Sequence, residues 1–273
     1  MTAVRSLIAL AAVAQLAPLS SSAAQSTGAP FIEEMTWTEV RDAIAGGKRV
    51  VIIPIGGTEQ NGPHMVLGKH NYIVTHAAKM IADRLGDALV APTVQYVPEG
   101  DYTRPGFGDK PGVISLPSPA YDRLLDAAAR SLRVHGFTDI LLIGDSGGNQ
   151  RGMTQVADSL NREWNGTGVR VHALVDYYQQ GRVRAREWLL QTYGWDEQTV
   201  GSHAGTSDTS QLLYVYPAGI RTTKLAPGGG SPDSGVSGDP TKASAEIGKK
   251  IVQIKVDAAV AQYTTGKTVD GRR

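Results

Sequence analysis

The chain has 273 residues, with 27 basic and 26 acidic side chains and a formal net charge of +1. Basic residues form no stripe along it, so the sequence gives no electrostatic support for a nucleic-acid partner. The absence of cysteine excludes a thiolate nucleophile or metal ligand, and an aromatic content of only 6 % argues against a stacking platform for bases or long glycans.

The first 24 residues have the pattern of a secretory signal peptide. Arg5 forms a positive n-region, residues 6–16 form a short apolar run, and residues 22–24 are small, which predicts cleavage after Ala24. The apolar run is shorter than the ~20 residues of a membrane-spanning helix. We therefore expect a periplasmic or secreted protein with no membrane partner after cleavage, in which residues 25–273 form a single α/β domain.

Apolar runs and helical spacings alternate along the rest of the chain. A capping pattern at residues 36–39 predicts a helix that ends at residues 46–47, and residues 50–55 form the continuous apolar run of a strand buried on both faces. The same reasoning predicts further strands over 89–97, 140–143 and 169–175, and helices over 72–85, 121–134, 150–163 and 240–263. This alternation predicts a parallel sheet with helices on both faces.

Ligands of such a sheet collect at the carboxyl ends of its strands. Polar, glycine-rich segments at 56–70 and 144–149 follow two predicted strands, and a third polar segment spans 201–210. The second segment is typical of a helix N-terminus, whose N–H groups favour an anion or a developing oxyanion. The candidate substrate-binding residues are Asn61 in the first segment and Asp145, Gly147, Gly148 and Asn149 in the second.

Four motifs in these and neighbouring segments follow one another in a familiar order. They are Pro-Ile-Gly-Gly-Thr-Glu-Gln-Asn-Gly-Pro-His at 54–64, His-Gly-Phe at 135–137 with Gly-Gly-Asn at 147–149, His-Ala-Gly at 203–205 with Thr-Ser at 209–210, and Ser-Gly-Asp-Pro at 237–240. The ordered set resembles the creatininase (creatinine amidohydrolase) family over most of the mature chain. The resemblance implies a three-layer α/β/α sandwich with a mainly parallel central sheet, assembly into a homo-oligomer (often a hexamer), and a dinuclear zinc or manganese centre. It also implies hydrolysis of C–N bonds in small, often cyclic, amides.

The family's metal-ligand positions are only partly kept. Glu59 is unchanged, but Asn61 stands where the family has His, and His70 stands where it has the bridging Asp. In the later segments Ser146 occupies a His position and Asp208 replaces Glu. Because a neutral His70 would remove both the bridge and a negative charge, we expect that the ordinary two-metal centre does not form. A single zinc or manganese on Glu59, His70 and Asp208 (or Asp145) and a site without metal both remain open.

The leading hypothesis is an exported hydrolase of a C–N bond in a small molecule, with an altered metal site. Its candidate catalytic residues are Glu59, as base or metal ligand, His203, which matches the family's proton-shuttling histidine, and Asp208, which orients His203 or binds metal. Ser146 is a candidate nucleophile, although no Gly-x-Ser-x-Gly elbow surrounds it. Two alternatives remain open: a metal-independent acid–base enzyme, a lyase or hydrolase using Glu59, His70 and His203, and a non-catalytic binder of a small ligand.

Overall fold

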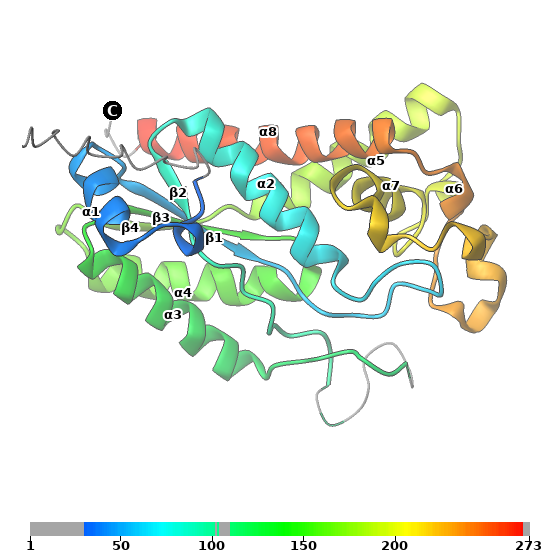
Figure 1. Cartoon of the computed structure of the whole chain (residues 1–273), viewed down its shortest axis with the longest axis horizontal. Helices are drawn as coiled ribbons and strands as arrows, with labels where there is room; N and C mark the ends of the chain where they lie inside the picture. Colours follow the sequence, from blue (N-terminus) through cyan, green and yellow to red (C-terminus); the bar gives the residue numbers. More distant parts are fainter. Residues whose placement is uncertain (1–29, 102, 104–109, 270–273) are drawn as a thin grey trace, which may run out of the picture.

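A computed structural model describes residues 30–101, 103 and 110–269 of the chain. The predicted signal peptide, residues 1–24, lies outside the described residues. Within them, four parallel strands form one sheet in the order β2-β1-β3-β4, and helices cover both of its faces (Figure 1). The strands are β1 (Val50–Ile55), β2 (Ala88–Val90), β3 (Asp139–Gly144) and β4 (Arg170–Ala173). The prediction of a three-layer α/β/α sandwich with a parallel sheet is therefore confirmed.

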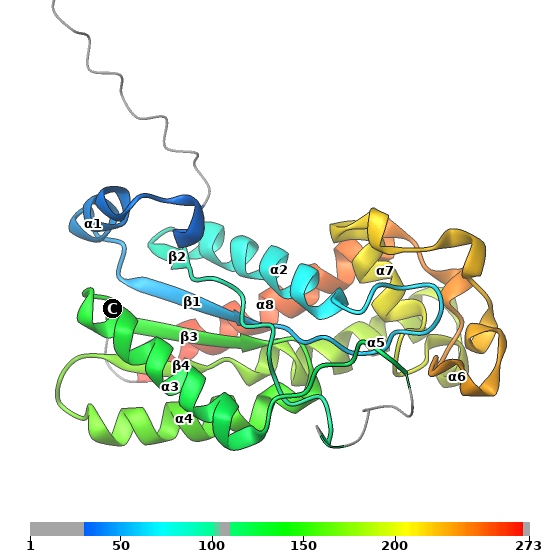
Figure 2. The same ribbon diagram turned by 60° about the horizontal axis from the view of Figure 1, so that its bottom comes forward.

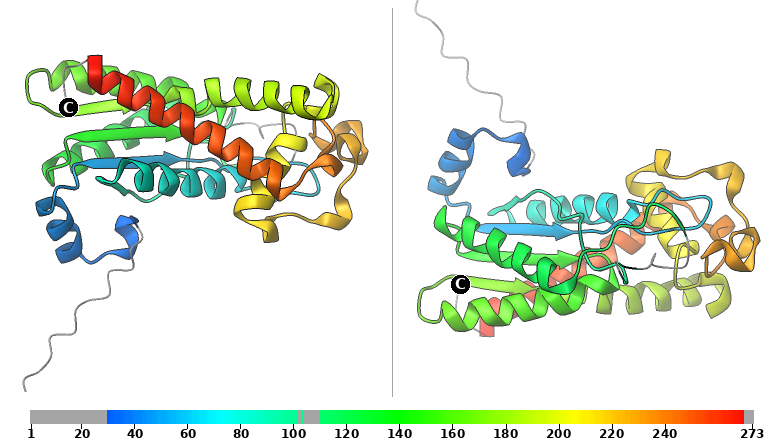
Figure 3. Two further views of the ribbon diagram at one scale, coloured as in Figure 1. Left: turned by 90° about the horizontal axis from the view of Figure 1, so that it is seen from above. Right: turned by 90° about the horizontal axis from the view of Figure 1, so that it is seen from below.

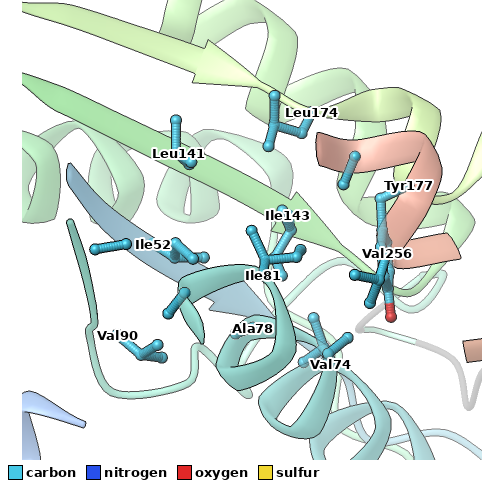
Figure 4. Close-up of a cluster of buried hydrophobic side chains, with 14 of the residues drawn as sticks. Ile52, Val74, Ala78, Ile81, Val90, Leu141, Ile143, Leu174, Tyr177 and Val256 are labelled. Carbon is cyan, nitrogen blue, oxygen red and sulfur yellow. The ribbon is translucent and has the colours of Figure 1, made fainter. Parts of the chain in front are cut away.

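The two faces of the sheet bury two separate apolar clusters, because successive side chains of a strand point to opposite faces. On one face, Ile52 and Leu141 pack against α2 (Lys69–Leu85) and α8 (Ala245–Val269), as Figure 4 shows. On the other face, the cluster that contains Ile53 and Leu142 packs against α3 (Ser118–Val134) and α4 (Gln150–Glu163). The views from above and below in Figure 3 show α8 crossing one face and the two green helices α3 and α4 covering the other.

The remaining helices lie at the ends of the sheet. The short helix α1 (Trp37–Ala45) begins at a capping box in which Thr36 and Glu39 bond each other's backbone N–H groups, as predicted. At the opposite end, α5 (Gln179–Tyr193), α6 (Glu197–Val200) and α7 (Thr206–Val215) lie near or beyond the tips of β1 and β3 (Figures 1 and 2). These three helices therefore stand beside the carboxyl ends of the strands, where ligands of a parallel sheet collect.

Several predicted boundaries are wrong. The strand expected over 89–97 ends at Val90, because Pro92 has no N–H to donate and the following residues keep only an isolated bridge between Val94 and Ile55. The helix expected from residue 240 begins at Ala245, after Ser244 accepts the N–H of Ile247. The helix expected from residue 72 begins at Lys69. Helices α5, α6 and α7 were not predicted.

None of the helices in the described part of the chain combines the length and the apolar character that crossing a bilayer requires.

Candidate functional site

The three polar segments meet in one pocket at the carboxyl edge of the sheet. The pocket has a volume of about 630 Å³, which is within the usual size range of small-molecule sites. Segment 56–70 follows β1, segment 144–149 follows β3, and segment 201–210 leads into α7. Of the predicted site residues, the pocket is lined by Glu59, His70, Asp145, Ser146, Gly147, Gly148, His203 and Asp208.

Two predicted substrate-binding residues instead hold the loops together and are not among the pocket's lining residues. Asn61 is fully buried, and its amide donates to the carbonyl oxygens of Glu59 and Val66, at 3.0 and 3.1 Å. Asn149 is also fully buried and donates to the carbonyl oxygen of Gly56 at 3.2 Å. Both side chains fix the backbone that carries the pocket residues, since buried amides need such partners.

A buried lysine that the sequence reasoning missed connects the first and third segments. Lys69, the first residue of α2, places Nζ 3.1 Å from Glu59 Oε1 and 2.8 Å from Asp208 Oδ2. Burial alone would lower the pKa of Lys69, but the carboxylates of Asp208 and Glu59 outweigh it and hold the pKa above its usual value. Burial would likewise raise the pKa of Glu59, yet Lys69 and His70 lower it to about 2. This lysine and both carboxylates are therefore charged at neutral pH.

His70 connects the first segment to the second. Its Nε2 lies 2.8 Å from Glu59 Oε1 and its Nδ1 lies 2.6 Å from Asp145 Oδ2. Burial and the nearby Lys69 would lower the pKa of His70, but the hydrogen bonds to Asp145 and Glu59 outweigh them and raise it to about 9. This pKa favours an imidazolium that donates from both nitrogens to the two carboxylates, in contrast to the neutral ring assumed from the sequence.

A second buried lysine, also missed, completes the network from α8. Lys255 Nζ contacts Asp145 Oδ1 directly and lies 3.1 Å from Gln211 Oε1. Tyr177 donates its hydroxyl to the same Asp145 oxygen at 2.9 Å, and the ammonium lies 4.5 Å from the centre of its ring. Burial would raise the pKa of Asp145, but Lys255 and His70 hold it below its usual value. Three carboxylates and three cations thus form one chain of ion pairs in the pocket. Its order is Asp208, Lys69, Glu59, His70, Asp145, Lys255.

His203 is placed by an unusual backbone turn. The next residue, Ala204, has φ +52°, and among the residues that the structure describes it is the one non-glycine with positive φ. Such a conformation costs about 1–3 kcal/mol and is typical of functional sites. The Nε2 atom of His203 lies 2.8 Å from the carbonyl oxygen of Gln60, and Nδ1 lies 3.8 Å from Glu59 Oε1. Burial and Lys69 lower the pKa of His203, so the ring is neutral at pH 7.

Glu99 is a further pocket residue that the sequence reasoning missed. Its side chain is buried, and the hydroxyl of Ser146 donates to Glu99 Oε2 at 3.4 Å. Burial, together with the charge of Glu59, raises the pKa of Glu99 to about 7. A signal was present in the sequence, because Glu99 follows a predicted strand at its carboxyl end.

The second segment is arranged differently from the predicted anion-binding helix end. Residues 147–149 form only a 3-10 turn, and the N–H of Gly148 is bound to Ser146 Oγ at 3.4 Å. The carboxylate of Asp208, proposed to orient His203, instead accepts from Lys69 and from the N–H of Ala204. Because Ser146 is directed to Glu99, the arrangement favours acid–base chemistry over a serine nucleophile.

The predicted metal ligands Glu59, His70 and Asp208 do not fit a metal ion. A ligating histidine must be neutral and present a lone pair, whereas both nitrogens of His70 donate to carboxylates. The ammonium of Lys69 already lies between the other two proposed ligands. In the described ranges no three His, Asp or Glu side chains are grouped so that they could hold a metal.

Comparison with known proteins supports the resemblance seen in the sequence. The chain is 29 % identical over 192 residues to the creatinine amidohydrolase of Pseudomonas putida, covering 68 % of this chain and 72 % of that protein. It is 28 % identical over 236 residues to a mycofactocin precursor peptide peptidase of Mycobacterium tuberculosis, covering 77 % and 82 %.

Solved structures agree with the sequence relatives. A mutant creatininase superimposes with a TM-score of 0.69 at 25 % identity, covering 85 % of this chain and 96 % of the other. Another solved creatininase, described with manganese, gives a TM-score of 0.68 at the same identity and coverage. The family model for creatinine amidohydrolase matches residues 33–263, and the chain therefore belongs to the creatininase family.

Proposed function

We propose that this protein is an exported creatininase-family hydrolase that cleaves a C–N bond in a small molecule by acid–base catalysis from its own side chains. Amidohydrolase activity on a C–N bond follows from family membership. We propose in addition that the substrate is a small molecule, that the mechanism is acid–base catalysis, and that the protein is exported. The relatives act on substrates of different size by their names, creatinine in one case and a precursor peptide in the other. A pocket of about 630 Å³ favours the smaller class.

The proposal depends on one observation, the opposite environments of two carboxyl groups in the same pocket. Lys69 and His70 keep Glu59 ionised, whereas burial beside that charge raises the pKa of Glu99 to about 7. Pairs of carboxyl groups with divergent pKa values are typical of acid–base active sites. With its pKa near 7, Glu99 is able to donate a proton at neutral pH, and the neutral His203 is able to accept one.

These roles define a balanced reaction. His203 takes a proton from water while the water oxygen bonds to the substrate's carbonyl carbon. Glu99 gives its proton to the leaving nitrogen as the C–N bond breaks, and the proton held by His203 then passes to Glu99 through solvent, which restores both groups. Glu59, whose pKa of about 2 makes it a poor base, stabilises the imidazolium that forms 3.8 Å away. Ser146, whose hydroxyl donates to Glu99 in the free protein, is the proposed donor to the substrate's carbonyl oxygen once it turns from Glu99 to the bound substrate.

A panel of cyclic and linear amides, followed by detection of the released amine, tests this function. We expect turnover with at least one small amide and a loss of about 10²–10⁴-fold in the His203→Ala variant. His135→Ala is the matched control, because His135 is exposed and precedes β3, whereas the pocket lies at the carboxyl end of that strand. Binding of amides without turnover in the wild-type protein would instead support the non-catalytic alternative.

The export and assembly of the protein are separate proposals. The signal-peptide pattern of residues 1–24 supports a periplasmic or secreted enzyme, and the family resemblance supports a homo-oligomer. Mass spectrometry of the N-terminus after expression in a bacterium should find a chain that begins at Gln25. Light scattering of the mature protein should give a mass that is a multiple of the protomer, and a monomer would contradict the assembly.

A further inference from the structure

The ammonium of Lys69 lies between two side chains at positions where the family resemblance places metal ligands. Two of the resemblance's ligand positions, Glu59 and Asp208, come from different segments and both approach Lys69 Nζ, at 3.1 and 2.8 Å. The lysine side chain is only 1 % exposed, so no water layer separates it from these oxygens. Carboxylates from distant parts of the chain thus converge on one fixed cation.

This lysine is in a doubly unfavourable position. Removing an ammonium from water costs several kcal/mol, and the N-terminus of α2, where Lys69 is the first residue, repels positive charge. Among the described residues, the carboxylates of Glu59 and Asp208 offset these costs. A lysine that is unfavourable both for burial and for a helix N-terminus, and that lies in the pocket, is expected to have a functional role rather than to stabilise the helix.

The other carboxylate of the network has its own cations. Asp145 is bound by the ammonium of Lys255 and by the imidazolium of His70, which also bonds Glu59. Three positive groups therefore balance three negative groups. A divalent ion entering between Glu59 and Asp208 would first have to displace the ammonium of Lys69 or leave two units of positive charge uncompensated beside it.

We propose that Lys69 replaces a metal ion in this site, so that the protein excludes zinc and manganese. Lys69 acts as a positioning residue: its ammonium, 3.1 Å from Glu59 Oε1, holds that carboxylate beside His203 in place of a metal. The catalytic consequence rests on the proposed hydrolase function, whereas the exclusion of metal does not.

The wild-type protein provides the first test. Elemental mass spectrometry on protein purified without chelator and without a nickel column should find far less than one zinc or manganese per chain. Zinc or manganese chloride should leave the melting temperature unchanged. One or more metal ions per chain, or stabilisation by either metal, would overturn the proposal.

The Lys69→Ala variant provides the second test, because it removes the ammonium and leaves Glu59, Asp208 and His203 in place. We expect this variant to melt at a lower temperature and to recover by about 5 °C in an excess of zinc chloride. Adding Asp208→Asn should abolish the recovery. Lys79→Ala is the matched control, because Lys79 lies on the same helix but pairs with Asp83 at the surface. If folded Lys69→Ala gained no affinity for zinc, the proposal would be wrong.

If Lys69→Ala does not fold, Lys69→Gln, which keeps a polar side chain of similar length, takes its place in the same titration. The metal measurements also separate this inference from the proposed function. Wild-type protein with neither metal nor turnover would refute the hydrolase while leaving the exclusion of metal intact. Metal-loaded wild-type protein with turnover would refute the exclusion and leave hydrolysis intact.

Discussion

Glu99 combines a buried side chain, a position in the pocket and a raised pKa, and these make it the residue whose removal is most informative. The neighbouring Glu59 is ionised and held by Lys69 and His70, so its charge acts on Glu99 across the whole neutral range. The burial and the raised pKa of Glu99 are both caused by residues that are not its neighbours in the sequence. A glutamate with the same sequence neighbours on an open surface would be fully ionised at pH 7.

The Glu99→Gln variant should lower kcat by about 10²–10⁴-fold and remove the pH dependence near pH 7. The physical reason is that glutamine keeps the shape of the side chain but has no proton to give. The pH profile of kcat/KM measures this on any substrate found by the amide panel. Glu187→Gln is the control, because Glu187 is exposed on α5. An unchanged pH profile in Glu99→Gln would assign the proton transfer to another group.

At the scale of elements, the strands and helices of the fold were easier to predict from the sequence than the charged residues that line the pocket. The apolar runs at 50–55 and 140–143 correspond closely to β1 and β3, because a strand buried on both faces leaves a distinct pattern. Helices α5 and α7 were not predicted, because their apolar residues do not form one clear stripe along the helix. Motif order located the pocket, since residues after parallel strands meet at one edge.

The lysines of the pocket could not be predicted in the same way. Lys255 lies 110 residues from its partner Asp145 in the sequence, and a lysine within a long helix usually faces solvent. The carboxylates that pair with these lysines, Asp145 and Glu59, also raise the pKa of His70, which favours a cation where a metal ligand was expected. Only the tertiary structure brings these charges together.

Lys255 should also anchor α8 to the carboxyl end of β3. The Lys255→Met variant leaves the buried carboxylate of Asp145 with one cation fewer, and we expect it to lower the free energy of unfolding by about 3 kcal/mol. Urea denaturation measures the loss. Lys250→Met, at an exposed position of the same helix, should change the free energy by less than about 0.5 kcal/mol. Equal effects of the two substitutions would mean that the buried ion pair adds nothing to stability.

At the scale of the whole molecule, the buried charges make stability depend on pH on both sides of neutrality. The folded-state pKa of Glu59 is depressed from 4.5 to about 2, so its contribution is complete above pH 4.5 and is lost as the pH falls through 2. The folded-state pKa of His70 is raised from 6.5 to about 9, so its contribution is complete below pH 6.5 and is lost as the pH rises through 9. The folded-state pKa of Glu99 is raised from 4.5 to about 7, so its contribution is complete below pH 4.5 and is lost as the pH rises through 7.

The melting temperature should therefore be highest on the acidic side of neutrality, near pH 5, and should fall as the pH rises from there to 9. The loss assigned to His70 is roughly 3 kcal/mol, because one pKa unit corresponds to about 1.4 kcal/mol. Thermal unfolding in buffers from pH 4 to pH 10 measures the profile. In His70→Gln, which cannot carry the charge, the protein should be less stable at pH 6 but should lose most of its alkaline dependence. If His70→Gln kept the full alkaline fall, the cation that joins Glu59 to Asp145 would not be the source of the pH dependence.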